Sequence, residues 1–356
     1  MTSEPFKARY LPVDQWPLPC QSLWRDALTE ADLFEAPKPA TLWRKATIRK
    51  NCCAFGTFVS WTIYIDDWNP DATPVDFVTS AKVKNFLTDM EASHYASNTI
   101  FCHIQGLYDS VRVMSPETDW GWLLNAVKKI RARTKPLYNK LQRLQPAQKL
   151  AVLGQKLMQD AENNTNLTMY KRSLMYRDGL IIATLIHRPL RLGNFASFSL
   201  GQSLLLHQTG ATIVLPPEEM KGKRPFEAKF PPNLQAELNT YLEVYRPYLL
   251  SLQHEKTIEP VTGVWISNEG RAMTDHSIRN AIKKRTRIAF GQDLTPHLFR
   301  DASVTTLVRD APASAQLTKA ILGHSTIETT NKYYNQAKMV DASRRHTSLM
   351  EQLINS

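Results

Sequence analysis

The chain has 356 residues, of which 43% are hydrophobic and 22% are charged, with 13 glycines and 21 prolines. At about 150 residues per domain this length favours two domains, and the composition excludes a collagen-like or wholly disordered chain. Lysine and arginine together number 44 against 33 aspartates and glutamates, which gives a formal net charge of +11. Such a charge favours a polyanion as partner, with nucleic acid ahead of an acidic membrane surface.

The sequence contains no candidate for a membrane segment. Its longest strongly apolar run, 180–186, is far shorter than the roughly 20 residues that a bilayer span needs, and its first residues lack an apolar signal-peptide core. The four cysteines, at 20, 52, 53 and 102, have no CxxC spacing, which argues against a zinc site and a disulfide framework. We therefore expect a folded cytoplasmic protein with reduced thiols.

The first part of the chain predicts a small helical domain. Residues 1–36 are rich in proline and tryptophan without a sustained period, so they are interpreted as an amino-terminal extension whose order the pattern leaves open. Apolar residues at helical spacing then predict helices from Thr41 onward, over 80–91 and over 97–113, within a domain spanning 37–127. The first of these helices begins with a cluster of basic residues that are candidates for DNA contact: Arg44, Lys45, Arg49 and Lys50.

A basic segment follows. Residues 128–149 carry eight basic and no acidic residues, with prolines at 136 and 146, which predicts a linker between two domains. A solvated helix face with a hinge is the structural alternative, but like charges repel one another unless a polyanion lies against them. Four further candidates for DNA contact lie here: Lys128, Lys129, Arg131 and Arg133.

The second domain, 150–334, is predicted to be mostly helical with one small antiparallel sheet. A buried helix over 169–186 ends before Pro189, and short apolar or alternating runs at 203–207, 211–215 and 226–230 predict three strands. Helices are predicted again over 234–248, 275–290, 296–308, 314–322 and 326–334, with Thr274 as the N-cap of the second and Gly291 near its end. A tail over 335–356 closes the chain.

Four segments of this domain hold polar residues that a purely structural helix does not need. Arg191 stands at a broken helix end, and Lys221 stands at the turn between two predicted strands. His297 and Arg300 share a helix face at i, i+3 spacing, and His324 precedes Tyr333 by nine residues. Taken singly, such residues are more often capping, solvated or hydrogen-bonded core residues.

Taken together and in this order, they resemble the catalytic signature of the tyrosine recombinases, which include phage integrases and Xer-type resolvases. The segments 295–300 and 322–334 resemble the family's H-x-x-R, L-G-H-S and T-T-x-x-Y motifs, and 190–195 resembles L-R-x-x-E-L. Pro189 departs from the family's usual glycine and Asn194 from its acidic residue, which puts any role of that carboxylate in doubt. The resemblance implies a helical core-DNA-binding domain, an α+β catalytic domain and a homo-tetramer on DNA to which the tail contributes subunit contacts.

The chemistry of phosphodiester cleavage explains these residue types. Cleavage without a metal or cofactor, as we expect here, needs a nucleophile, compensation for charge on the phosphate oxygens and a proton for the leaving 5′ oxygen. Arg191 and Arg300 supply forked donors to the phosphate, and Tyr333 is the expected nucleophile, with Tyr334 as the alternative. His297 is the expected base or phosphate donor.

Two further roles complete the predicted site. His324 is expected to donate a second hydrogen bond to the scissile phosphate. The resemblance implies that Lys221 is the general acid, with Lys223 as the alternative because the turn cannot be aligned to one residue. We therefore expect a site-specific DNA recombinase that acts through a 3′-phosphotyrosyl intermediate, and most simply the integrase of a mobile element.

The same residues leave two alternatives open, a type IB topoisomerase-like DNA relaxer and a non-cleaving DNA-binding protein. The expected partner is double-stranded DNA carrying core sites, in the cytoplasm and associated with the nucleoid. A companion recombinase or a directionality factor is left open, and no membrane partner is expected.

Overall fold

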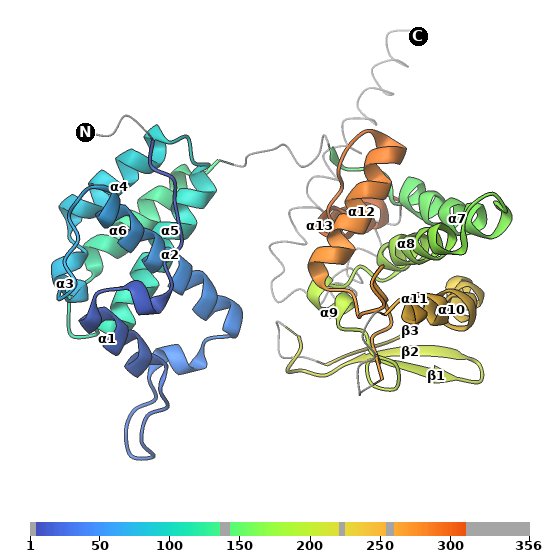
Figure 1. Ribbon diagram of the computed structural model, residues 1–356, viewed down its shortest axis with the longest axis horizontal. Helices are drawn as coiled ribbons and strands as arrows, with labels where there is room; N and C mark the ends of the chain where they lie inside the picture. The colour runs from blue at the N-terminus through green and yellow to red at the C-terminus, as the bar shows by residue number, and fades with distance from the viewer. Residues whose placement is uncertain (1–4, 136–142, 221–224, 254–259, 311–356) are drawn as a thin grey trace, which may run out of the picture. The chain divides into compact units, whose positions relative to one another are not determined.

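The computed structural model describes residues 5–135, 143–220, 225–253 and 260–310, and the chain splits into two compact units, Met1–Asn139 and Lys140–Ser356 (Figure 1). We call them unit 1 and unit 2. The helices predicted over 314–322 and 326–334 and the tail over 335–356 lie outside the described residues. Within the described residues, no helix is long and apolar enough to cross a membrane.

Unit 1 is helical throughout its described part. Its helices are η1 (Val13–Gln15), α1 (Leu18–Leu28), η2 (Pro39–Leu42), α2 (Lys45–Tyr64), α3 (Pro74–Phe77), α4 (Ser80–Ala92), α5 (Ser97–Met114) and α6 (Gly121–Arg133). The core is aromatic: the ring of Phe58 meets those of Phe86 and Phe77 edge to face, at centroid distances of 5.3 and 5.7 Å. Such edge-to-face pairs add to the stabilisation from apolar burial.

Residues 5–36, the described part of the segment interpreted as an amino-terminal extension, contribute side chains to this core. Phe6, Trp16 and Trp24 are at most 3% exposed, and the Trp16 ring lies 4.6 Å from that of Phe55 in α2. The Trp16 indole nitrogen donates to the carbonyl of Leu11 at 3.0 Å. These aromatic side chains are buried by residues far from them in the sequence, so no local periodicity predicts their burial.

The expected linker over 128–149 is shorter in the structure. Residues 128–133 form the last turns of α6, and α7 begins at Ala147. The end of α6 is fixed to α5, because the Ser97 hydroxyl donates to the carbonyl of Lys135 at 3.2 Å and accepts from its amide at 3.1 Å. The division between the two units falls at residues 139 and 140, inside the basic segment.

Unit 2 combines helices with one small sheet. Its helices are α7 (Ala147–Asn163), α8 (Met169–His187), α9 (Leu192–Ala196), η4 (Pro232–Leu234), α10 (Gln235–Thr240), η5 (Tyr241–Tyr245), α11 (Arg246–Ser251), α12 (Asp275–Phe290) and α13 (Pro296–Asp310). The strands β1 (Leu204–His207), β2 (Gly210–Leu215) and β3 (Phe226–Lys229) form an antiparallel sheet in the order β1-β2-β3. The predicted fold class, mainly α with a small antiparallel sheet, is confirmed.

The sheet buries one face. Residues of β2 alternate between half-buried and buried, as expected for a strand with one side against a core, and Figure 1 shows the helices of unit 2 gathered on one side of the sheet. In register, Ile213 of β2 lies between Leu204 and Ala228. The sheet therefore closes one side of the unit 2 core.

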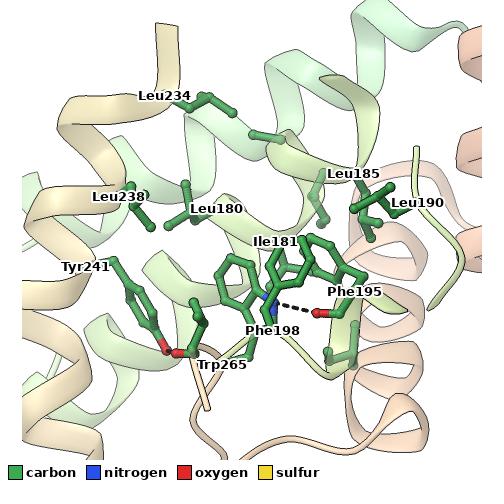
Figure 2. Packing of buried hydrophobic residues seen from close by; sticks show 14 of the residues in the cluster. Leu180, Ile181, Leu185, Leu190, Phe195, Phe198, Leu234, Leu238, Tyr241 and Trp265 are labelled. Atoms are coloured by element: carbon green, nitrogen blue, oxygen red, sulfur yellow. Dashed lines mark hydrogen bonds between the residues drawn. The ribbon is translucent and has the colours of Figure 1, made fainter. Parts of the chain in front are cut away.

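Helix α8 runs through the centre of this core. Leu180, Ile181 and Ile182 are fully buried, and Figure 2 shows Ile181 beside the rings of Phe195 and Phe198. The indole nitrogen of Trp265 donates to the carbonyl of Phe195 at 3.1 Å, drawn as a dashed line in Figure 2. Residues 176–185 of α8 are all buried, which is typical of a helix segment in the interior of a domain.

Helices α7 and α8 approach each other at two glycines. A Cβ atom on Gly154 would lie 2.8 Å from the carbonyl oxygen of Gly179, and one on Gly179 would lie 2.7 Å from the carbonyl oxygen of Gly154. Both distances are shorter than van der Waals contact. The two helices can therefore lie this close only because both positions are glycine and carry no Cβ.

Candidate active site

Arg191 lies at the bend between α8 and α9. Proline disfavours helical backbone at the preceding residue, and Arg188 accordingly leaves the helix at φ −131° and ψ 82°. Leu190 is buried at 4% exposure, while Arg191 is half-buried and occupies the N-cap position of α9 in extended conformation. The broken helix therefore places a cation at a corner of the unit 2 core.

Helix α13 packs its first turns against the same corner. Pro296 begins the helix, where its missing N–H has no cost, and Leu298 and Phe299 are buried at 6% and 0% exposure. Arg300, 6% exposed, donates from its guanidinium to the carbonyl of Pro189. His297, one helical turn before Arg300, is exposed.

A second bond fixes the same contact. The hydroxyl of Ser303 donates to the carbonyl of Ile186 at 2.9 Å. Arg300 and Ser303, one turn apart in α13, thus bind carbonyls on either side of the end of α8: Ser303 binds that of Ile186 in the last turn, and Arg300 binds that of Pro189, two residues before Arg191. Of the predicted residues, Arg191 and Arg300 thus lie at this corner, and His297 lies in the first turn of α13.

Asn194 connects α9 to the segment that follows β2. Its amide nitrogen donates to the carbonyl of Glu219 at 3.4 Å and lies 2.9 Å from the sulfur of Met220, which is 7% exposed. An amide can donate to a carbonyl, whereas an ionised carboxylate only accepts. The departure from the acidic residue noted in the sequence therefore creates a hydrogen bond that an aspartate or glutamate could not make.

A buried charge cluster, which the sequence analysis missed, stabilises α8. Asp178 accepts from Arg177 at 2.7 Å with one carboxylate oxygen and from Arg285 of α12 at 2.9 Å with the other. Arg177 also donates to the carbonyl of Ile266 at 2.7 Å. The side chains of Arg177 and Asp178 are 6% and 5% exposed, and burying a charge is tolerated only where it is paired. The sequence signal that could have indicated this cluster is the pair of adjacent opposite charges, Arg177 and Asp178, next to the apolar run 180–186.

Burial and pairing shift the pKa values of ionisable groups in unit 2. Burial lowers the pKa of Arg188, whose guanidinium donates to the carbonyls of Lys229 and His187 at 3.1 Å each. The hydrogen bonds from Arg287 lower the pKa of Asp293, in the segment between α12 and α13. Burial raises the pKa of Tyr241 to about 12, so this core tyrosine stays protonated.

The remaining predicted catalytic residues, Lys221, His324 and Tyr333, lie outside the described residues, as do the alternatives Lys223 and Tyr334. Within the described ranges no group of three or more histidine, cysteine, aspartate or glutamate residues could hold a metal ion.

The predicted DNA contacts of unit 1 lie at two helix ends. In the first turns of α2 or just before it, four of these residues are exposed: Arg44, Lys45, Arg49 and Lys50. Lys50 pairs with Asp109 of α5 at 3.3 Å. In the last turns of α6, the other four residues are also exposed: Lys128, Lys129, Arg131 and Arg133. The guanidinium of Arg131 lies over the Phe101 ring, 6.0 Å from its centroid.

The two clusters interact differently with the dipoles of their helices. Cations are favoured near a helix C-terminus, as at the end of α6, and disfavoured near an N-terminus, as at the start of α2. The α6 cluster therefore has a structural explanation in its own helix. Arg44 and Lys45, at the N-terminal end of α2, have no such favourable interaction with the dipole of their helix.

Comparison with known proteins identifies the family. A model of the phage integrase family matches residues 155–339. The tyrosine recombinase XerD of Staphylococcus aureus is 31% identical over 102 residues, which are 28% of this chain and 32% of that protein. XerD of Lacticaseibacillus casei is 30% identical over 118 residues, or 32% of this chain and 38% of that protein. The matched segments thus span about a third of the length of these curated relatives.

Solved structures show the same fold over a longer stretch. The XerH site-specific recombinase bound to difH substrate, in a pre-cleavage complex, has a TM-score of 0.55 at 13% identity and covers 96% of this chain and 99% of that one. XerH in a post-cleavage complex with palindromic difH substrate has a TM-score of 0.54 at 12% identity, with coverage of 98% and 100%. Because the family model matches more than half of its residues, the chain belongs to the phage integrase family of tyrosine recombinases.

Proposed function

We propose that the chain is a site-specific DNA recombinase that cleaves and rejoins DNA through a 3′-phosphotyrosyl intermediate. The observation that carries the proposal is the bond from Arg300 to the carbonyl of Pro189. It holds the H-x-x-R helix against the bend that carries Arg191, so that two guanidinium-bearing segments meet at one corner. The further proposal that the chain is the integrase of a mobile element rests on the phage integrase family itself.

The two arginines are suited to one scissile phosphate. A guanidinium carries five N–H donors in a planar fork, so one group can bind both a backbone carbonyl and a phosphate oxygen. Arg300 is nearly buried, and a charge-assisted hydrogen bond gains strength where water is excluded. Together, Arg191 and Arg300 would compensate the charge that develops on the two non-bridging oxygens.

The remaining roles follow from the motif order. The phenolic oxygen of Tyr333 attacks the scissile phosphorus, the bond from phosphorus to the 5′ oxygen breaks, and Lys221 protonates the departing 5′ oxygen. His297, exposed on the first turn of α13, takes the phenolic proton or donates to the phosphate, and His324 donates to the phosphate. The phosphotyrosyl bond conserves the energy of the broken ester, so a 5′ hydroxyl can reseal a strand without a nucleotide cofactor.

The proposed partner is duplex DNA. The exposed cations at the start of α2 supply phosphate contacts from unit 1, and phosphate contacts dominate affinity for DNA. XerH, whose fold this chain shares, is bound to its difH substrate. We extend the proposal to two units, joined by the basic segment 128–149, that both contact a core site. We also extend it to a homo-tetramer on DNA with the tail over 335–356 at the subunit contacts.

Covalent trapping tests the proposal. Wild-type, Tyr333→Phe and Tyr334→Phe proteins are incubated with nicked duplexes from the flanks of the gene or the ends of the element, then denatured and sized. The nick lets the cut fragment leave, so the adduct accumulates. We expect an adduct with the wild type and Tyr334→Phe and none with Tyr333→Phe.

Other outcomes change the assignment. Loss of the adduct only in Tyr334→Phe moves the nucleophile by one residue. Relaxation of an unrelated supercoiled plasmid by the wild type favours a topoisomerase-like relaxer. DNA binding without an adduct on any flanking sequence favours a non-cleaving protein, and it would overturn the proposed reaction.

A further inference from the structure

Unit 1 carries an acidic loop with an apolar tip. Residues 29–37, between α1 and η2, include three carboxylates, at Glu30, Asp32 and Glu35, and no basic residue. At the tip, Leu33 and Phe34 are 90% and 94% exposed, more than any other large hydrophobic residue in the described ranges. Exposed apolar side chains of this size, clustered together, mark a contact site.

The acidic loop is held in shape at its tip and its base. The side chain of Asp32 accepts from the amide of Phe34 at 3.1 Å, and the carbonyl of Asp32 accepts from the amide of Glu35 at 3.0 Å. At the base, Lys38 pairs with the carboxylate of Asp26 at 2.7 Å. A loop ordered before it binds loses less entropy on docking.

Unit 1 also contains an apolar groove with a basic rim. The groove has a cavity volume of about 380 Å³ and is lined by Phe6, Ile63 and Tyr64, with Lys7 and Arg9 among the lining residues and no acidic residue. Ile63 and Tyr64 are 48% and 39% exposed. We call this the basic-rimmed groove.

The loop and the groove complement each other in shape and charge, because an apolar tip flanked by carboxylates matches an apolar groove flanked by cations. Figure 1 shows the loop protruding below α1, at the end of unit 1 opposite the first described residues, which line the groove. A single copy therefore cannot fill its own groove with its own loop.

We propose that the acidic loop of one copy docks in the basic-rimmed groove of a second copy, with Leu33 and Phe34 in the groove and the loop carboxylates facing Lys7 and Arg9. Such a contact is head to tail, since it joins two different surfaces of the same unit. The copies carry +11 each and repel one another, and a local acidic element offsets that repulsion at one defined place. This association requires no strand cleavage.

Sedimentation velocity of the full chain without DNA tests the proposal, with concentrations up to about 100 μM so that weak association is populated. The loop variant carries Leu33→Ser and Phe34→Ser, and the groove variant carries Lys7→Glu and Arg9→Glu. We expect self-association of the wild type to weaken at least about tenfold in either variant. Leu42→Ser is the matched control, because Leu42 is 79% exposed just outside the loop and should leave association unchanged.

Mixing the two variants is the decisive experiment. The loop variant keeps an intact groove and the groove variant keeps an intact loop, so an equimolar mixture should form a one-to-one complex that neither variant forms alone. A wild type that stays monomeric over the whole range, a loop variant that associates like the wild type, or a mixture without a complex would each overturn the proposal. Unchanged thermal unfolding of both variants establishes that they are folded.

Discussion

The contact between Gly154 and Gly179 makes α7 and α8 sensitive to a single methyl group. Replacing Gly154 by alanine places a Cβ 2.8 Å from the carbonyl oxygen of Gly179 and 2.9 Å from the backbone nitrogen and Cβ of Ala183. These atoms belong to helix backbone and to a short side chain, so they cannot rotate away. The helices must move apart by several tenths of an ångström, which loosens the packing around fully buried Leu180.

Two effects of opposite sign set the magnitude. Alanine favours the helix over glycine by about 1 kcal/mol, whereas overpacking a core costs about 1–3 kcal/mol. Because backbone atoms oppose the methyl group, we take the upper part of that range and expect Gly154→Ala to destabilise unit 2 by about 2 kcal/mol. Gly179→Ala should cost a similar amount, and the double variant should cost less than the sum because the helices separate only once.

Native-state hydrogen exchange, read by mass spectrometry on peptides of α8, isolates unit 2 from unit 1. Gly193→Ala is the matched control, since a Cβ at that helical position would meet no heavy atom within 4 Å, and it should be neutral or slightly stabilising. A Gly154→Ala variant as stable as the wild type, or more stable, would refute the reasoning.

Three further predictions follow from the described residues. Asp178→Asn should destabilise unit 2 by about 3 kcal/mol in urea unfolding, because it leaves buried Arg177 and half-buried Arg285 without their carboxylate; a loss below about 1 kcal/mol would contradict this. Burial lowers the pKa of His103 below its ordinary 6.5, so just below pH 6.5 the unfolded chain binds more protons than the folded one. Unit 1 should therefore lose stability on acidification, by at most about 1.4 kcal/mol per pH unit. In urea unfolding at about pH 7.5 and 5.5, His103→Gln should remove this contribution to the pH dependence. Arg300→Lys should reduce covalent trapping at least about 100-fold while DNA binding persists; trapping at the wild-type level would count against a forked donor at this position.

Local chemistry predicted both ends of one helix of unit 2 to the residue. Helix α12 begins after Thr274, whose side chain accepts from the amide of Ser277 at 3.2 Å, and ends at Gly291, which has a φ of 68°. A hydroxyl cap and a left-handed glycine are properties of the residues themselves. The break between the strand runs predicted at 203–207 and 211–215 likewise falls at the β1–β2 turn.

Tertiary burial hid other elements from the sequence. Trp16 and Trp24 lie in a segment without periodicity, and only the surrounding helices of unit 1 give them a core to enter. The last turns of α6 were interpreted as linker because their charges, Lys128 to Arg133, resemble those of a solvated connection.

The predicted site shows the same division between local and long-range information. The order of motifs singled out Arg191 and Arg300, but nothing local indicates that Arg300 donates to the carbonyl of Pro189, 111 residues earlier in the chain. In the sequence, Asn194 is only a departure from the family's acidic residue. Its bond to the carbonyl of Glu219 could not be predicted, because it depends on where the segment after β2 lies relative to α9.

The π-helical turn η5 has a consequence for the history of the sequence. A turn with i to i+5 bonds contains one residue more than an α-turn, so α10, η5 and α11 together form one helix with a single inserted residue. Because a π-turn advances each residue by a smaller angle than an α-turn does, η5 absorbs the extra residue and α11 keeps the phase of α10. Deleting one residue within η5 should therefore restore regular α-helix and leave Arg246 facing the carbonyls of Val261 and Gly263 to which it donates. Relatives that lack the inserted residue can thus keep an arginine at the position of Arg246.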